Sequence, residues 1–187
     1  MIVGADRADG ARLADQSVRR WAFLSVGVVA VLVVIAAAAG LREAAMPQVA
    51  VETVDPRTLH INGEFVEANL GSAVETDGTV TVRVIGQQYS FTPQCILVPA
   101  ATPITFRATS ADVIHGFLIG ETNLNEMLVP GYISVFRARF NALGDHLMPC
   151  HEFCGVGHEG MWAKVRVIDK KQFFELARKR QRLDCAE

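Results

Sequence analysis

Two cysteines, a histidine and a methionine stand close together near the C-terminal end of the chain. Cys150, Cys154, His158 and Met161 follow the spacing C-x3-C-x3-H-x2-M. Thiolate, thioether and imidazole groups are ligands that favour copper over hard cations. One cysteine with histidine and methionine would suffice for a single-copper centre, whereas two thiolates four residues apart can each bridge two metal ions. The segment therefore predicts a copper site, and the second cysteine favours a pair of ions.

A second imidazole has to come from elsewhere in the chain, and His115 is the best candidate. It lies in the apolar run Val113-Ile114-His115-Gly116-Phe117, which is typical of a buried strand. Gly116 allows the backbone of another segment to approach closely. A histidine in such a run is ordinarily a core residue with satisfied hydrogen bonds, but the ligand-rich segment downstream favours a ligand.

Two other interpretations of the cysteine segment stay open. Zn²⁺ could be bound in a tetrahedron by two thiolates and two imidazoles, from Cys150, Cys154, His115 and His158. That site would give Met161 no role. A disulfide between Cys150 and Cys154 would leave both histidines and the methionine unexplained.

The remaining histidines and cysteines are not predicted to be ligands. His60 lies in a turn-rich region and is expected on the surface, and His146 is expected beside the site or exposed. Strand-like alternation would point His151 away from the thiols. Cys95, in an apolar run, is expected to be a small buried residue, and Cys185 is expected to be a free thiol near the C-terminus.

The elements that must position these residues are mostly strands. Polar and apolar residues alternate in four segments, 79–85, 102–108, 132–140 and 163–167. Short strands of this kind, separated by glycine and proline, predict a mainly β fold, an antiparallel barrel or sandwich. After it, Asp169 is a plausible N-cap for a basic helix from Lys170 to Leu183.

An uncharged apolar stretch occupies residues 22–41, with Trp21 at its edge. Its length matches the roughly 20 residues that span a bilayer, and it exceeds the core of a cleaved signal sequence. The predicted organisation is a cytoplasmic segment 1–20, a transmembrane helix 21–41, a linker region 42–78, a copper domain 79–168 and a basic tail 169–187. Arginines before the stretch favour a cytoplasmic N-terminus and an exported domain.

Acidic residues outnumber basic ones between 51 and 168, although the net charge of the whole chain is only −2. An acidic exported domain attracts basic protein partners at long range. Solubility is the simpler explanation of the same charge. We expect membrane lipid as a partner of the apolar helix and no nucleic-acid partner.

The motif as a whole resembles subunit II of the haem–copper terminal oxidases, the cytochrome c oxidases. The residues that carry the resemblance are Cys150-x-Glu152-x-Cys154-Gly155-x-Gly157-His158-x-x-Met161 and, upstream, Asp112-Val113-Ile114-His115. It covers residues 79–168 together with the apolar helix. It implies a cupredoxin-like β-barrel that carries the dinuclear copper centre CuA.

The resemblance also implies a role for each residue of the motif. Cys150 and Cys154 would be bridging thiolates, and His115 and His158 terminal imidazoles, one for each copper. Met161 would be the weak axial ligand of one copper, and the backbone carbonyl of Glu152 would complete the other. The Glu152 carboxylate corresponds to a group that binds Mg²⁺ at a subunit interface in many relatives.

The chain departs from the commonest pattern of this family in two ways. It has a single apolar helix in place of two, which is similar to the ba-type oxidases. A tryptophan-rich stretch used for electron uptake is replaced by Gln87-Gln88-Tyr89-Ser90-Phe91. Tyr89, Phe91 and Trp162 are the candidates for that role, although an aromatic core residue is the default interpretation of each.

The function implied is electron transfer without catalysis by this chain itself. A soluble c-type cytochrome or small copper protein would deliver electrons to the copper pair, which would pass them to haem in oxidase subunit I for O2 reduction. The expected location is the inner membrane of a prokaryote, crossed once, with the copper domain on the periplasmic side. The alternatives are the corresponding subunit of a nitric oxide reductase and a membrane-anchored protein for copper storage or delivery.

Overall fold

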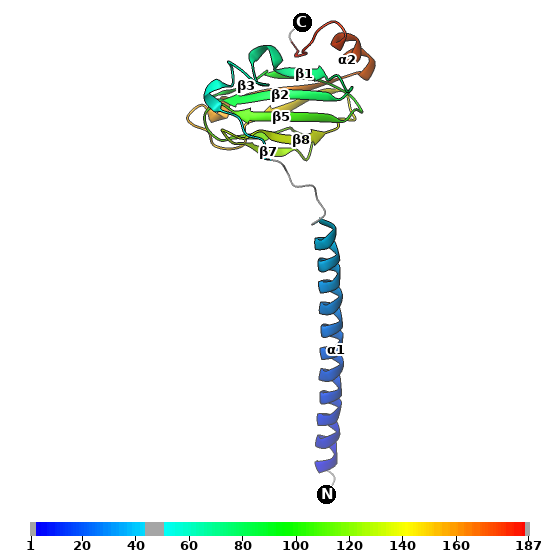
Figure 1. Cartoon of the computed structure of the whole chain (residues 1–187). Coiled ribbons are helices and arrows are strands. Elements are labelled where there is room, and N and C mark those ends of the chain that lie inside the picture. The colour runs from blue at the N-terminus through cyan, green and yellow to red at the C-terminus, as the bar shows by residue number, and fades with distance from the viewer. Residues whose placement is uncertain (1–2, 44–50, 186–187) are drawn as a thin grey trace. The chain divides into compact units, whose positions relative to one another are not determined.

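The described part of the N-terminal unit is one long helix. The computed structural model describes residues 3–43 and 51–185, and the chain forms two compact units, 1–50 and 51–187. Helix α1 runs over Val3–Glu43, so residues before 21 continue the same helix as the apolar stretch (Figure 1). Its segment Asp15–Leu41, of 27 residues, is long and apolar enough to cross a membrane. Every described residue of that segment is exposed.

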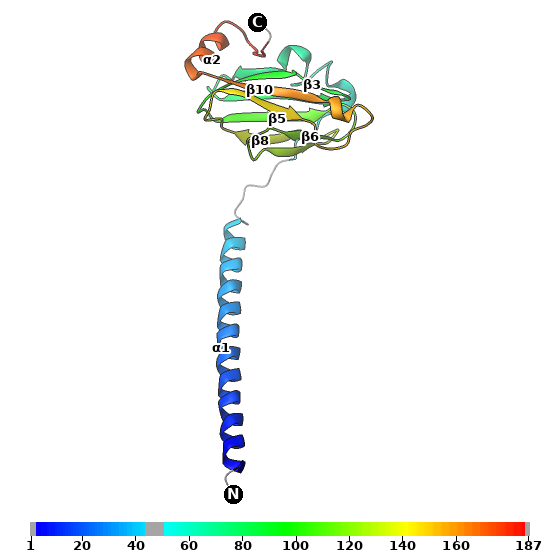
Figure 2. The same cartoon turned by 180° about the vertical axis from the view of Figure 1, so that it is seen from behind.

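The second unit is built from strands, which form two sheets and a separate hairpin within residues 51–185. The larger sheet has the order β1-β2-β5-β8, with β3 paired to β2, and the smaller has the order β4-β10-β9. Figure 1 faces the larger sheet, and the reverse view in Figure 2 brings β10 of the smaller sheet forward. The bounds are β1 Gly71–Val74, β2 Val80–Gln87, β3 Ser90–Thr92, β4 Cys95–Pro99, β5 Ile104–Ser110, β6 His115–Leu118, β7 Asn125–Leu128, β8 Ser134–Ala138, β9 Gly144–Pro149 and β10 Trp162–Ile168.

The mainly β fold predicted from the sequence is confirmed, and most strand pairs are antiparallel. Two pairs are parallel: β2 with β5, and β4 with β10. Parallel neighbours need a crossover connection. Here the chain leaves β2 through β3, passes along β4 in the smaller sheet and returns to the larger sheet as β5. The crossings tie the two sheets together, so both contribute to one core.

The core between the sheets is rich in phenylalanine. Phe106 of β5 and Phe136 of β8 are opposite each other in the strand register and stack at 5.3 Å between ring centroids. Phe117 packs edge-on against both rings and against Phe91. Valines from β2 and β10 fill the remaining space between the sheets. This core reaches the start of β6, where His115 lies.

The described part of the predicted linker, residues 51–78, is folded onto the larger sheet. Leu59, Phe65 and Leu70 are buried together with Ile85 of β2. Val82 and Val84 of β2 point into the main core, so Ile85 lies on the other face of that strand. Residues 71–74 form strand β1. This segment therefore covers the outer face of the larger sheet. The polar–apolar alternation of the strands predicts that this face is exposed to solvent.

The C-terminal segment differs from its prediction in two ways. Helix α2 begins as expected after Asp169, whose carboxylate accepts hydrogen bonds from two backbone N–H groups, but it covers only Lys170–Ala177. Leu183 lies beyond it, buried, and its backbone pairs with Ser72 of β1. Cys185 forms a disulfide with Cys95, 90 residues earlier in the chain. The expectations of a buried unpaired Cys95 and a free Cys185 are therefore wrong, because a long-range partner is not visible in the local sequence.

Candidate metal centre

Two neighbouring strands and their connecting loop hold most of the predicted ligands. Cys150 directly follows β9, and Met161 directly precedes β10. The Cys150 N–H donates to the Met161 carbonyl at 3.0 Å, and this hydrogen bond joins the two ends of the loop 150–161. Within the loop, His158 begins a short 3-10 helix, His158–Gly160. The antiparallel pairing of β9 and β10 therefore brings both ends of the ligand segment together.

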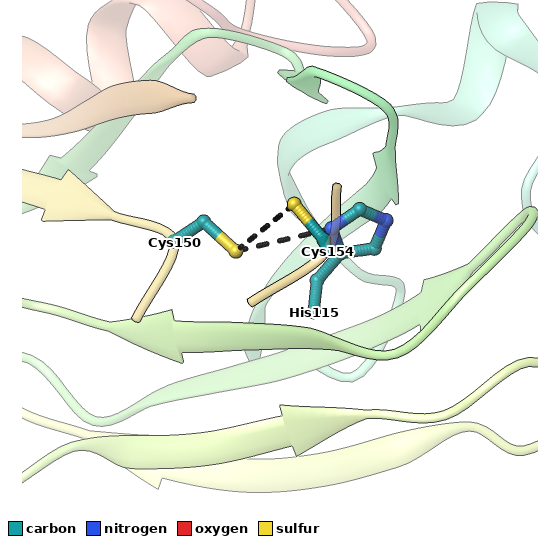
Figure 3. Close-up of side chains that lie close together, drawn as sticks. All are labelled: His115, Cys150 and Cys154. Carbon is teal, nitrogen blue, oxygen red and sulfur yellow. Dashed lines mark hydrogen bonds between the residues drawn. The ribbon is translucent and has the colours of Figure 1, made fainter. Parts of the chain in front are cut away.

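The other predicted ligand comes from a different part of the sequence. His115 is the first residue of β6, which pairs only with β7 among the described strands. Its Nδ1 lies 3.9 Å from Cys150 Sγ. Figure 3 shows the imidazole of His115 pointing toward the two cysteine sulfurs. Their ligand atoms all lie within 4.8 Å of one another.

The other four predicted donors gather around the two cysteine sulfurs, which lie 3.8 Å apart. Cys150 Sγ has the Glu152 carbonyl oxygen at 3.2 Å, in addition to His115. Cys154 Sγ has His158 Nδ1 at 3.6 Å and Met161 Sδ at 3.8 Å. Each sulfur therefore has its own imidazole and its own weaker donor. At 3.8 Å the sulfurs are not bonded, and both cysteines are free.

The donors are almost completely shielded from solvent. The exposed fraction is 0% for His115 and Met161, 6% for Cys150 and 5% for Cys154. His158 is half-buried, and Glu152, which contributes a backbone carbonyl, has an exposed side chain. A buried site replaces water around a bound ion with fixed protein groups. This arrangement suits retention of a metal more than its exchange.

Asp112 fixes the orientation of His115. Its Oδ1 lies 2.8 Å from His115 Nε2 and therefore leaves Nδ1 facing the thiols. Burial of the Asp112 carboxylate opposes its ionisation, but hydrogen bonds from the Gln88 N–H, His115 and the Val113 N–H outweigh burial and lower its pKa. The carboxylate is therefore ionised and accepts a hydrogen bond from His115, as in many metal sites where a carboxylate orients a ligating imidazole.

The thiols are suited to binding a cation together. Burial raises the pKa of the Cys154 thiol to about 11, and the Cys150 thiol beside it adds to the increase. Two adjacent thiolates are therefore unfavourable without a positive charge between them. A soft metal ion supplies that charge and displaces the protons. Two thiols, two imidazoles, a thioether and a carbonyl are a donor set that fits copper.

Comparison with known proteins assigns the chain to a family. Residues 80–168 match the family Cytochrome C oxidase subunit II, periplasmic domain. A cytochrome c oxidase subunit 2 of Thermus thermophilus is 33% identical over 122 residues, which cover 65% of this chain and 90% of the relative. The chain belongs to the cytochrome c oxidase subunit II family.

Two further comparisons concern a second relative and the fold. A heme-copper oxidase subunit 2 of Aeropyrum pernix is 34% identical over 118 residues, which cover 52% of this chain and 48% of the relative. A chain in the cryo-EM structure of a heme-copper terminal oxidase dimer superposes with a TM-score of 0.52 at 24% identity, over 75% of this chain and 95% of that one. The cupredoxin-like fold predicted from the motif is therefore confirmed. All six donors lie inside the residues that match the family.

The three aromatic residues predicted to serve electron uptake lie in different surroundings. Phe91 is completely buried, and its ring packs edge-on at 6.5 Å from the His115 ring. Tyr89 is 40% exposed and lies against the loop at Gly155 and Gly157. Trp162 is 49% exposed, and its Nε1 donates to the Glu159 carbonyl at 2.7 Å. Only Tyr89 and Trp162 therefore have a surface that a partner protein could contact.

The other three histidines lie in different surroundings. His60 is exposed, and His146 lies within hydrogen-bond distance of the Gly120 carbonyl, 3.1 Å from Nδ1. His151 packs against Gly116, and its buried Nδ1 has no hydrogen-bond partner among the described residues.

Sequence reasoning missed two residues that contact this centre. Asp112 was noted only as part of the family motif, although its position three residues before His115 would place a carboxylate within reach of the imidazole. Gln88 donates its side-chain amide to the Cys154 carbonyl at 2.5 Å. Nothing in the spacing of a glutamine so distant in sequence indicates that contact.

Proposed function

We propose that this protein is the electron-accepting subunit of a membrane terminal oxidase and that it binds two copper ions. The observation that carries the proposal is the division of the donors between two sulfurs 3.8 Å apart, with His115 and the Glu152 carbonyl beside Cys150 and with His158 and Met161 beside Cys154. A mononuclear tetrahedral site needs only four donors. Two imidazoles on different thiols favour a pair of ions that share both thiolates.

The bound copper pair would supply reversible one-electron chemistry. The part of this chain is to hold the donors in place and to exclude water, so that little rearranges when the charge changes. Burial of His115, Cys150, Cys154 and Met161 supports this role. The hydrogen bond between Asp112 and His115 fixes one imidazole before any metal arrives. O2 reduction would belong to the haem-containing subunit I.

The surface beside the centre supports contact with a small redox protein. A shallow pocket next to the thiols is lined mainly by apolar side chains, Val113, Ile114, Met127 and Phe153, together with Glu152, Cys154 and Gly155. Phe153 is 74% exposed. An exposed apolar patch of this kind marks an interaction site. A soluble c-type cytochrome or a small copper protein would dock here, with Tyr89 or Trp162 at the margin for electron uptake.

The apolar helix would anchor this domain in the inner membrane of a prokaryote. Arg12, Arg19 and Arg20 precede the apolar stretch, and lysine and arginine are retained on the cytoplasmic side. The copper domain would then lie in the periplasm, where the Cys95–Cys185 disulfide is stable. The Glu152 side chain is exposed and would be free to bind Mg²⁺ at the interface with subunit I.

Copper loading of the full-length chain in detergent tests the proposal. The reduced protein is incubated with copper, desalted and examined by metal analysis and electron spin resonance. We expect two coppers per chain and one unpaired electron shared between both nuclei. A single bound ion, or the retention of zinc in preference to copper when both are offered, would contradict the proposal.

Cysteine variants show whether the signal comes from this site. Replacement of Cys150 or Cys154 by serine should abolish the shared-electron signal, because each removes a bridging thiolate. The double replacement of Cys95 and Cys185 by serine is the matched control and should keep the signal. Survival of the signal in Cys150→Ser or Cys154→Ser would count against the assignment.

The copper delivery alternative makes a different prediction. A delivery site exchanges its ion readily, whereas the donors here are buried. We therefore expect slow loss of copper to an excess of chelator, over hours. Co-purification of the catalytic subunit from the native membrane would distinguish an oxidase from a nitric oxide reductase.

A further inference from the structure

Gln88 contacts both segments that carry metal-binding residues, although it is not itself a candidate ligand. It follows β2, at the turn into β3. Its backbone N–H donates to Asp112 Oδ2 at 2.7 Å, and its side-chain Nε2 donates to the Cys154 carbonyl at 2.5 Å. The other oxygen of Asp112 faces His115 Nε2 at 2.8 Å. A single residue thus connects the His115 segment to the cysteine loop.

The cysteine loop also packs tightly on this turn. Gly155 has a φ of +137°, and a Cβ there would lie 2.8 Å from Gln88 Nε2 and 2.6 Å from Tyr89 Oη. At Gly157 a Cβ would lie 2.7 Å from Tyr89 Cδ2. Real Cβ atoms do not approach other atoms so closely, so a larger residue at either position would have to displace the Gln88 or Tyr89 side chain. The turn limits movement of the loop toward it, and the Gln88 amide limits movement away.

The hydrogen bond acts at a sensitive point of the loop. The carbonyl that accepts it belongs to Cys154, whose Sγ lies 3.8 Å from Cys150 Sγ and 3.6 Å from His158 Nδ1. A shift of the backbone at Cys154 would move its side chain relative to the other donors. The Gln88 side-chain amide therefore restrains the position of the Cys154 thiol relative to Cys150 and His158.

We propose that Gln88 is a positioning residue that holds the two halves of the metal centre in register before metal binds. Its backbone fixes Asp112, and through it His115, while its side chain fixes Cys154. The inference rests on the proposed function, because it concerns retention of copper by the same donors. Groups that hold ligands in place change metal affinity by roughly 10- to 100-fold when they are removed.

The test compares Gln88 with its neighbour Gln87. Gln87 is exposed, and its side chain makes no hydrogen bond in the described part of the chain. Gln88→Met removes the amide without adding charge, and Gln87→Met makes the same change next to it. Full-length protein in detergent is loaded with copper, and the rate of copper loss to a chelator and the electron spin resonance hyperfine pattern are measured. We expect Gln88→Met to lose copper about 10-fold faster or more, with an altered hyperfine pattern, and Gln87→Met to match the wild type.

The other possible results separate failure of this inference from failure of the proposed function. Equal rates and spectra for Gln88→Met and the wild type would overturn the inference while leaving the proposed function intact, as would equal effects of the two variants. A wild-type chain that does not hold two coppers would overturn the proposed function itself. If Gln88→Met does not fold, amide exchange in the metal-free wild type decides: slow exchange of the Gln88 N–H supports the inference, and exchange at the rate of an unprotected amide overturns it.

Discussion

At the scale of single residues, the two sulfurs of the site differ in their weaker neighbours. Cys150 Sγ faces a backbone carbonyl, and Cys154 Sγ faces the thioether of Met161. A carbonyl oxygen is a harder donor than a thioether, so the two halves of the centre would differ in electronic character. Only the Met161 thioether can be removed by substitution, because every residue at position 152 keeps the backbone carbonyl.

Met161→Leu should keep two coppers and change the reduction potential. The swap conserves volume and should cost less than about 1.5 kcal/mol of stability, while it removes an axial donor that tunes the potential. Electrochemistry of the loaded chain measures the shift. Met148→Leu is the control, because Met148 is equally buried but lies on β9. An unchanged potential in Met161→Leu would contradict the ligand role of Met161.

Gly116→Ala should destabilise the site through a steric clash. A Cβ at residue 116 would lie 2.1 Å from His151 Nδ1 and 2.7 Å from the Glu152 backbone nitrogen. Because one of these atoms is backbone, the loop itself has to shift, at a cost of roughly 1–3 kcal/mol. Chemical denaturation of the metal-free chain measures this cost. Gly160→Ala, where a Cβ meets nothing within 4 Å, should be close to neutral; equal effects of the two changes would refute the clash.

At the scale of elements, local sequence patterns predicted the features that depend on neighbouring residues alone. The spacing of Cys150, Cys154, His158 and Met161 placed the ligands in one loop, and period-two alternation located β2, β5 and β10. The parallel pairings, the end of α2 at Ala177 and the burial of Leu183 depend on contacts between distant segments. The Gln88 contact with Cys154 belongs to the same class, with a sequence separation of 66 residues. Such contacts arise from packing, which alternation along one strand does not encode.

The C-terminal segment is held to the domain by a covalent link that no local pattern indicated. Cys95 at the start of β4 and Cys185 are 5.4 Å apart between Cα atoms. Their disulfide closes a loop of about 90 residues, for which the chain-entropy relation gives a stabilisation of up to about 4–5 kcal/mol. We expect the double serine variant to lose roughly 2–5 kcal/mol in chemical denaturation, and wild-type protein treated with a reductant to lose a similar amount. No change in either experiment would show that the link does not restrain the unfolded chain.

At the scale of the whole β-domain, six charged side chains form a chain of ion pairs across the larger sheet. This outer ion-pair chain consists of Glu52, Arg107, Glu64, Arg83, Glu75 and Arg182. Arg83 lies on β2 and Arg107 on β5, whereas Glu52 comes from the N-terminal end of the described domain and Arg182 from its C-terminal segment. The network therefore connects both ends of the domain to the same sheet.

The outer ion-pair chain makes stability depend on pH in the acid range. Burial of Glu75 opposes its ionisation, but Arg83 and Arg182 outweigh burial and lower its pKa below the ordinary 4.5. Arg107 likewise lowers the pKa of Glu52, through a hydrogen bond and charge attraction. A carboxyl group with a lowered folded-state pKa stabilises the protein fully above its unfolded pKa, and this contribution disappears as the pH falls through the lowered value.

Glu75→Gln should therefore destabilise the domain at neutral pH and have little effect in acid. Its partners Arg83 and Arg182 have side chains 12% and 17% exposed, so we expect a loss of about 1 kcal/mol at pH 7, the upper end for ion pairs open to solvent. The difference from the wild type should shrink as the pH falls below about 4.5. Denaturant unfolding of the metal-free chain between pH 3 and 7 measures it, with Glu175→Gln on the exposed face of α2 as the control. A difference that stays constant over this range would mean that Glu75 acts through packing and not through its charge.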